Sequence, residues 1–178
     1  ERTGVEALKR TTRDEPDYDV LMQGRLAILD QHGLRLTDIA EVIAGLEPLA
    51  GARRFLDELR SRTQVLILSD TFEQFAQPLM RQLGWPTLLC HRLVIDEDDR
   101  VTDYRLRQPD QKRRAVDALH GLNYRVLAAG DSYNDIAMLQ SADMGVLFRS
   151  PAKVQREFPE LPAVEAYDDL LALFVAEL

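Results

Sequence analysis

Cysteine is almost absent from the sequence, which has only Cys90 among its 178 residues. A single cysteine excludes an internal disulfide and favours a reducing, cytoplasmic compartment. Cys90 lies in the apolar segment TLLC, which indicates an inert thiol rather than a nucleophile. No apolar run approaches the roughly 20 residues that span a bilayer, and no signal peptide is visible, so no membrane association is expected.

Positive charge is also scarce, because 22 Lys and Arg residues against 30 Asp and Glu residues give a formal net charge of −8. This balance disfavours nucleic-acid binding as the main activity. An acidic protein that handles a small anion needs a local positive group, such as a metal ion or a few placed lysines and arginines. The length and the hydrophobic content of 46% are typical of a globular domain with a real core.

The residue pattern changes after Pro48. Residues 1–48 have helical spacing and no β-rich run, which predicts a small helical unit. Beyond Pro48, short apolar runs such as QVLIL and RVLAA alternate with helical segments, one of them (71–84) interrupted by Pro78. This alternation predicts an α/β fold with a Rossmann-like, doubly wound parallel sheet over residues 49–178.

Polar residues follow two of the expected strands. The sequence SDT at 69–71 follows QVLIL, GDS at 130–132 follows RVLAA, and a helix is expected directly after each. Ligands of open α/β sheets bind at the carboxyl ends of the strands, where helix N-termini favour anions. If the two strands are neighbours, Ser69 and Asp131 face one crevice.

Asp131 and Asp135 lie four residues apart, with Asn134 between them, around the expected start of a helix. Helix capping explains one of these acids and stabilises a helix by about 1 kcal/mol. The second explanation is a hard cation such as Mg²⁺, which takes one or two carboxylates and completes its shell with water and substrate phosphate. The segment by itself leaves both explanations open.

Lys112 lies at the expected start of another helix, for which Asp110 is the expected N-cap. A cation near a helix N-terminus costs a few tenths of a kcal/mol up to about 1 kcal/mol, so a lysine there is better explained if it reaches an anion. Arg25, on a helix of the first unit, is by itself no more than a surface charge. The three histidines are isolated in the sequence and are expected to be structural or surface residues: His32, His91 and His120.

Taken together, these motifs resemble those of the haloacid dehalogenase superfamily. A strand followed by Ser69, Lys112 at the head of a helix, and GDSYND at 130–135 match in order and spacing motifs two, three and four of its phosphatases. The strings ILSDTF, QPLMRQLG, PTLLCH and AAGDSYND are most similar to the phosphoserine phosphatase group, and within it to the bifunctional phosphoserine phosphatase/homoserine phosphotransferases. The resemblance spans nearly the whole chain.

The resemblance implies a Mg²⁺-dependent hydrolase of O-phosphoserine that acts in serine biosynthesis through an aspartyl-phosphate, with transfer of phosphate to homoserine as a further activity. It implies that residues 1–48 are a cap that selects a small phosphorylated amino acid, and that residues 49–178 are the catalytic core. The residues that it implies are Asp131 and Asp135 for the metal, Ser69, Asp70 and Asn134 for the phosphoryl oxygens, Lys112 for charge neutralisation, and Arg25 for the substrate carboxylate.

The chain departs from the family pattern in two places. Related phosphatases often have glycines after the motif-two serine, where this chain has Asp70 and Thr71. Motif one is an aspartate at the end of a strand with a second acid two positions later. It is not found after any segment that is expected to be a buried strand. We expect the nucleophilic aspartate on roughly twenty further residues before Glu1, enough for one strand and a loop. A protein that truly lacks motif one is expected to be inactive.

Two other functions follow from the same residues. The GDS sequence also matches the start of a serine-esterase signature, but that chemistry needs a histidine base, and no histidine follows His120. A non-catalytic phosphate-binding or regulatory module is the alternative if motif one is absent, because a fold alone does not establish a function.

Overall fold

The computed structural model describes residues 18–178, which form two compact units. The first unit contains residues 18–47, 70–82 and 90–106, and the second contains 48–69, 83–89 and 107–178. The boundary at residue 48 that was expected from the sequence stays a prediction. None of the described helices is long and apolar enough to cross a membrane.

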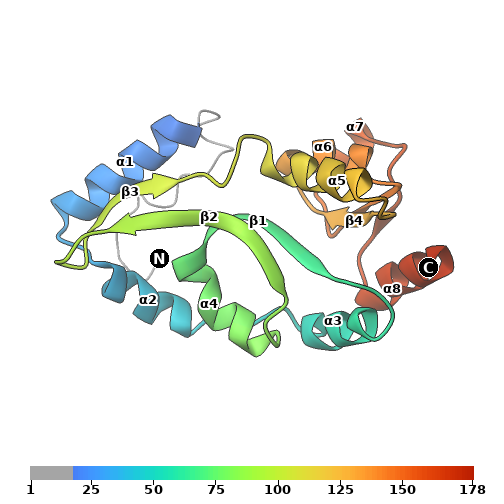
Figure 1. Ribbon diagram of the computed structural model, residues 1–178, viewed down its shortest axis with the longest axis horizontal. Helices are drawn as coiled ribbons and strands as arrows, with labels where there is room; N and C mark the ends of the chain where they lie inside the picture. Colours follow the sequence, from blue (N-terminus) through green and yellow to red (C-terminus); the bar gives the residue numbers. More distant parts are fainter. Residues whose placement is uncertain (1–17) are drawn as a thin grey trace. The chain divides into compact units, whose positions relative to one another are not determined.

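The first unit combines three helices with a β-hairpin (Figure 1). Its helices are α1 (Tyr18–Gln31), α2 (Leu36–Ala44) and α4 (Glu73–Gln82). Strands β2 (Thr87–Ile95) and β3 (Val101–Arg105) pair antiparallel. Residues Met22, Leu26 and Leu29 share one face of α1, and this face joins a core with Phe72, Leu93 and Val101.

The second unit contains the parallel part of the fold. Its strands are β4 (Leu127–Gly130), β5 (Met144–Phe148) and β6 (Ala163–Val164), with the first residues of β1 (Leu66–Phe72). Its helices are α3 (Ala52–Arg60), α5 (Gln111–Gly121), the 3₁₀ helix η2 (Tyr133–Asp135), α6 (Ile136–Ser141), α7 (Ala152–Glu157) and α8 (Tyr167–Glu177). β5 pairs parallel with both β4 and β6, with Gly130 opposite Leu147.

Strand β5 is buried on both faces. Val146 packs with residues of α3 and α8, and the next residue, Leu147, packs with residues of α5, α6 and α7. Both side chains are fully buried, and each such burial stabilises the fold by about 1.5–3 kcal/mol. Successive strand residues point to opposite faces, so helices cover both sides of this sheet. The parallel pairs and the two helical layers confirm the predicted α/β class.

The end of β1 differs from the prediction. We expected the strand to be QVLIL, with Ser69, Asp70 and Thr71 after its end, but it continues to Phe72, and α4 begins at Glu73. Thr71 is β-branched and Phe72 is buried in the core of the first unit, and both properties favour extension of the strand. Ser69 and Asp70 therefore lie inside a strand and not at the start of a helix.

Two helices differ in detail from the prediction. The segment with Pro78 is helical as expected, and Pro78 does not break it, since α4 runs through this residue to Gln82. Asp110 takes the N-cap position of α5, but with a φ of 49° and without a capping hydrogen bond from its side chain. Its carboxylate instead pairs with Arg113 one turn later, which is the neighbour that a helix surface offers at this spacing.

Asp143 connects the start of β4 to the last turn of α5. Its Oδ2 accepts the N–H of Val126 at 2.8 Å and lies 2.9 Å from Nε2 of His120. The Val126 N–H, followed by the His120 side chain, lowers the pKa of Asp143 below its usual value.

Because the folded-state pKa of Asp143 is lowered, its contribution to stability is present above pH about 4 and is lost as the pH falls through the folded-state pKa. We expect Asp143→Asn to flatten the fall in the free energy of unfolding between about pH 5 and pH 2, measured by urea denaturation. Glu97→Gln, in the exposed hairpin turn, is the control. If the free energy of unfolding of Asp143→Asn fell with pH as steeply as that of the wild type, this role would be contradicted.

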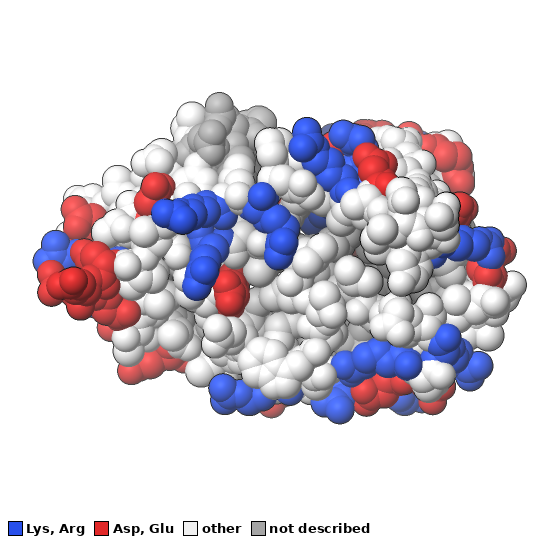
Figure 2. Space-filling model, in the orientation of Figure 1, with Lys and Arg blue, Asp and Glu red and all other residues white. Residues whose placement is uncertain are grey.

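Charges of both signs are interspersed on the surface. Figure 2 shows lysine and arginine side chains beside aspartates and glutamates on the face in view.

Candidate functional site

A buried carboxylate, Asp135, organises the loop that follows β4. Asp135 is only 5% exposed. Oδ2 accepts the backbone N–H groups of Asp131 at 3.0 Å and Ser132 at 3.1 Å, and the Ser132 hydroxyl at 3.1 Å. Oδ1 accepts the ammonium of Lys112 at 2.7 Å. These three N–H donors, together with the Ser132 hydroxyl when its proton points to Oδ2, offset the cost of burying the charge.

Gly130 lets the chain close against this carboxylate. A Cβ at position 130 would lie 2.4 Å from Cβ and 2.6 Å from Cγ of Asp135. Real Cβ atoms do not approach other carbons so closely, so only glycine fits at the end of β4 in this arrangement. The glycine that precedes the motif therefore has a steric reason within the chain itself.

Lys112 and Asp135 form a buried ion pair. Lys112, in the first turn of α5, is 8% exposed. Lys112 was expected to reach an anion. Among the described residues, the Asp135 carboxylate is an anion that it reaches. A buried ion pair recovers its desolvation cost poorly compared with apolar residues of the same volume. Its presence at the carboxyl end of a strand therefore points to function rather than to stability.

The residue before Lys112 makes a second connection. Gln111, which is 5% exposed, donates from Nε2 to the backbone carbonyl of Ser69 at 2.7 Å. The first turn of α5 thus contacts both β1, through Gln111, and the loop after β4, through Lys112. Nothing in the polar string PDQKRR indicates that Gln111 is buried, so this residue was not among the predicted site residues.

Asp131 and Asn134, which also belong to this loop, are exposed. Asp131 Oδ1 lies 3.3 Å from the Ser132 hydroxyl, and Asn134 Oδ1 lies 2.5 Å from the same hydroxyl. A hydroxyl has one proton, so these contacts and the one to Asp135 are alternatives for it. Within the described chain, the partners of Ser132 are thus two carboxylates and an amide, and not the histidine that an esterase nucleophile requires.

Both explanations of the paired aspartates apply, one to each residue. Asp135 is the third residue of η2 and receives the N–H of the N-cap residue, Ser132, so it is a capping carboxylate. Asp131 is exposed and can present oxygen to a ligand. Among residues 18–178, no three His, Cys, Asp or Glu side chains gather as a metal cluster. This donor set fits Mg²⁺ held by one protein carboxylate and completed by water and phosphate.

The two remaining predicted residues, Arg25 and Asp70, belong to the first unit, whereas Ser69, Lys112 and the loop residues belong to the second. Arg25 is half-buried on α1, where Nη1 lies 3.8 Å from Sδ of Met22. Asp70 Oδ1 lies 3.7 Å from Nε2 of His91, which is buried on β2. His91 is isolated in the sequence, and only the tertiary fold brings it to Asp70. The nucleophile expected before Glu1 lies outside the described residues.

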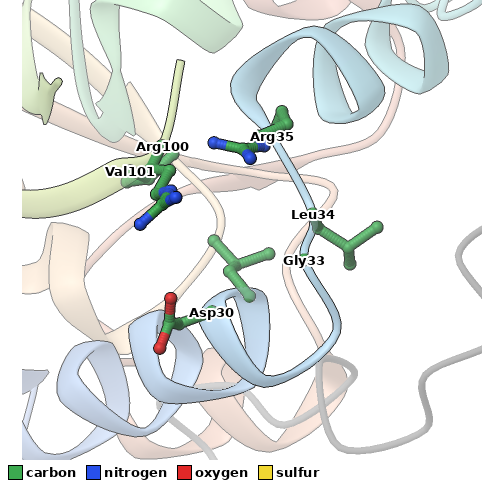
Figure 3. Close-up of a pocket in the computed structure, with 7 residues that line it drawn as sticks. Asp30, Gly33, Leu34, Arg35, Arg100 and Val101 are labelled. Atoms are coloured by element: carbon green, nitrogen blue, oxygen red, sulfur yellow. The ribbon is translucent and has the colours of Figure 1, made fainter. Parts of the chain in front are cut away.

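A cavity of about 230 Å³ in the first unit contains none of the predicted site residues. It is lined by Leu29, Asp30, Gly33, Leu34, Arg35, Arg100 and Val101 (Figure 3). Arg35 donates to the carbonyl of Asp98 at 2.5 Å, and Arg100 lies 3.6 Å from the carboxylate of Asp98. Both arginines of the lining thus contact the turn residue Asp98.

Comparisons with known proteins identify a family and several relatives of this chain. Residues 3–143 match the haloacid dehalogenase-like hydrolase family. The chain is 63% identical to "Phosphoserine phosphatase ThrH" of Pseudomonas aeruginosa over 175 residues. The aligned residues make up 98% of this chain and 85% of that protein. It is 62% identical to "Phosphoserine phosphatase" of Pseudomonas syringae pv. tomato, with 98% and 74% covered. A solved phosphoserine phosphatase from T. onnurineus has the same fold, with a TM-score of 0.67, 22% identity, and 94% and 78% covered.

Proposed function

Because the chain belongs to the haloacid dehalogenase-like hydrolase family, we propose that it hydrolyses O-phosphoserine through an aspartyl-phosphate, with Mg²⁺ as its cofactor. The observation that carries the proposal is the 63% identity, over nearly the whole chain, to a protein named phosphoserine phosphatase. The substrate is then a small phosphorylated amino acid, and the single cysteine supports a cytoplasmic location.

In this proposal Lys112 neutralises the phosphoryl oxygens. An ammonium has three N–H groups, so a lysine that donates to Asp135 can also serve a phosphoryl group. Asp135 fixes the direction of the lysine and, through the N–H groups of Asp131 and Ser132, the shape of the loop. Ser69 and Asn134 contribute a hydroxyl and an amide to the phosphoryl oxygens.

Asp131 is the proposed ligand of Mg²⁺, and Asp135 supports the metal site through the loop. When bound, the ion offsets negative charge on the transferring phosphoryl group. The exposed carboxylate of Asp131 beside a saturated, buried carboxylate supports this division of roles.

The proposal assigns substrate selection to a helical cap over residues 1–48. Arg25 recognises the substrate carboxylate, for which a planar, forked guanidinium is suited. The backbone at Asp70 contacts the phosphoryl group. Transfer to homoserine would use the same aspartyl-phosphate, with the alcohol in place of water, so the assay should include homoserine and follow phosphohomoserine as well as phosphate.

Asp131→Asn in the full-length natural protein is expected to lower kcat for O-phosphoserine by roughly 10²–10³, the usual effect of removing one preorganised electrostatic contact. The measurement is phosphate release over a range of Mg²⁺ concentrations. Chelation should abolish the activity and Mg²⁺ should restore it, which an esterase mechanism would not show. Asp169→Asn, an exposed carboxylate of α8, is the control. An unchanged rate in Asp131→Asn would contradict the assignment.

A further inference from the structure

We propose that Gln111 is a positioning residue of this site. Its side-chain amide holds the backbone carbonyl of Ser69, and this bond sets the position of the Ser69 hydroxyl relative to Lys112. The inference rests on the proposed function, because it concerns how the same phosphoryl group is held. Gln111 itself touches no reacting atom in this proposal and acts through Ser69.

The geometry of the first turn of α5 is the basis of the proposal. Gln111 and Lys112 are consecutive, so their side chains leave the helix in directions about 100° apart and reach different partners. Gln111 reaches Ser69 at 2.7 Å, and Lys112 reaches Asp135 at the same distance. Both pairs lie in the second unit. One helical turn therefore connects the strand that carries Ser69 to the loop that carries Asp131.

The chemistry of Gln111 also favours a specific role. A glutamine that is 5% exposed loses side-chain freedom and hydration, which a methionine of similar size would lose at a lower cost. In phosphoryl transfer, catalysis is positioning combined with electrostatic stabilisation. A displacement of the Ser69 hydroxyl by about 1 Å can cost roughly 10²-fold in rate, so a bond that fixes its backbone has a large effect.

The test is Gln111→Met in the full-length natural protein, because methionine keeps the length of the side chain and removes the donor. We expect kcat for O-phosphoserine to fall roughly 10- to 100-fold with a smaller change in KM, because the misplaced contact is made to the transferring group. Gln111→Glu, which keeps the shape and loses the N–H donors, should behave alike and serves if the methionine variant does not fold. Gln155→Met, which removes a similar bond to the Ser150 carbonyl at 2.9 Å, is the matched control.

A double-mutant cycle with Ser69→Ala separates positioning from general stability. If Gln111 acts through Ser69, Gln111→Met should cost little in the Ser69→Ala background, because the hydroxyl that it positions is gone. Additive losses in kcat, or wild-type kinetics in Gln111→Met, would overturn the proposal.

The same cycle is repeated with the affinity for inorganic phosphate, measured by calorimetry, as a readout that does not depend on turnover. Gln111→Met should weaken phosphate binding in the wild-type background and leave it unchanged in Ser69→Ala. If the wild-type protein binds phosphate but does not hydrolyse O-phosphoserine, the proposed function fails while this binding cycle still decides the role of Gln111. Equal losses of phosphate affinity in both backgrounds would overturn the role of Gln111 alone.

Discussion

Lys112→Met is expected to destabilise the protein by about 3–5 kcal/mol, the usual cost of removing one partner from a buried ion pair. The variant leaves the Asp135 carboxylate buried without its ammonium partner, while the N–H groups of Asp131 and Ser132 still hold it in place. The free energy of unfolding from urea denaturation measures the loss. Hydrolysis of O-phosphoserine should be abolished even at temperatures where the variant stays folded, because the charge on the phosphoryl group is no longer offset.

The double variant Lys112→Met/Asp135→Asn separates the two effects. Removing both charges eliminates the unpaired buried carboxylate, and replacing both partners of a buried pair is often close to neutral. We therefore expect most of the stability to return and the activity to stay lost. If the free energy of unfolding of Lys112→Met lay within about 1 kcal/mol of the wild-type value, the pair would not be buried as described.

Gly130→Ala is expected to have the second-largest effect, a loss of about 3 kcal/mol or more together with the loss of activity. The added methyl group would lie 2.4 Å from Cβ of Asp135, so either β4 or η2 must move. Any such movement pulls the Asp135 carboxylate away from its donors, which include the ammonium of Lys112. Urea denaturation and phosphate release measure the two effects.

Gly24→Ala is the matched control for this substitution. Gly24 lies in α1, and a Cβ there would meet nothing within 4 Å. Alanine in the middle of a helix is more stable than glycine by about 0.5–1 kcal/mol, so this variant should be slightly stabilised. If Gly130→Ala were as stable as Gly24→Ala, the close approach of Asp135 to β4 would be wrong.

The sequence predicts those parts of the fold that depend on local pattern. The apolar run RVLAA predicts β4, because a strand covered on both faces needs continuous apolar residues. The resemblance of GDSYND to a known motif locates the loop after β4, and the structure forms that loop around Asp135.

Features that depend on contacts distant in sequence were missed. The end of β1 was placed too early, because the burial of Phe72 in the first unit is a tertiary effect. The approach of His91 to Asp70 requires β1 and β2 to pair. Gln111 has no local signal, since its partner is the backbone of Ser69, and a backbone carbonyl leaves no trace in sequence. Asp110 is the N-cap residue of α5, as expected, but its carboxylate pairs with Arg113 and makes no capping hydrogen bond.

The start of α5 also has a consequence for the order of folding. The contact of Gln111 with Ser69 closes a loop of 42 residues, and the contact of Lys112 with Asp135 closes one of 23 residues. The entropy lost on closing a loop grows only slowly with its length, and these two loops meet at the same helical turn. Once α5 has docked on one side, the second loop closes at little additional entropic cost. The two halves of the site should therefore form cooperatively, because closure of one loop lowers the entropic cost of closing the other.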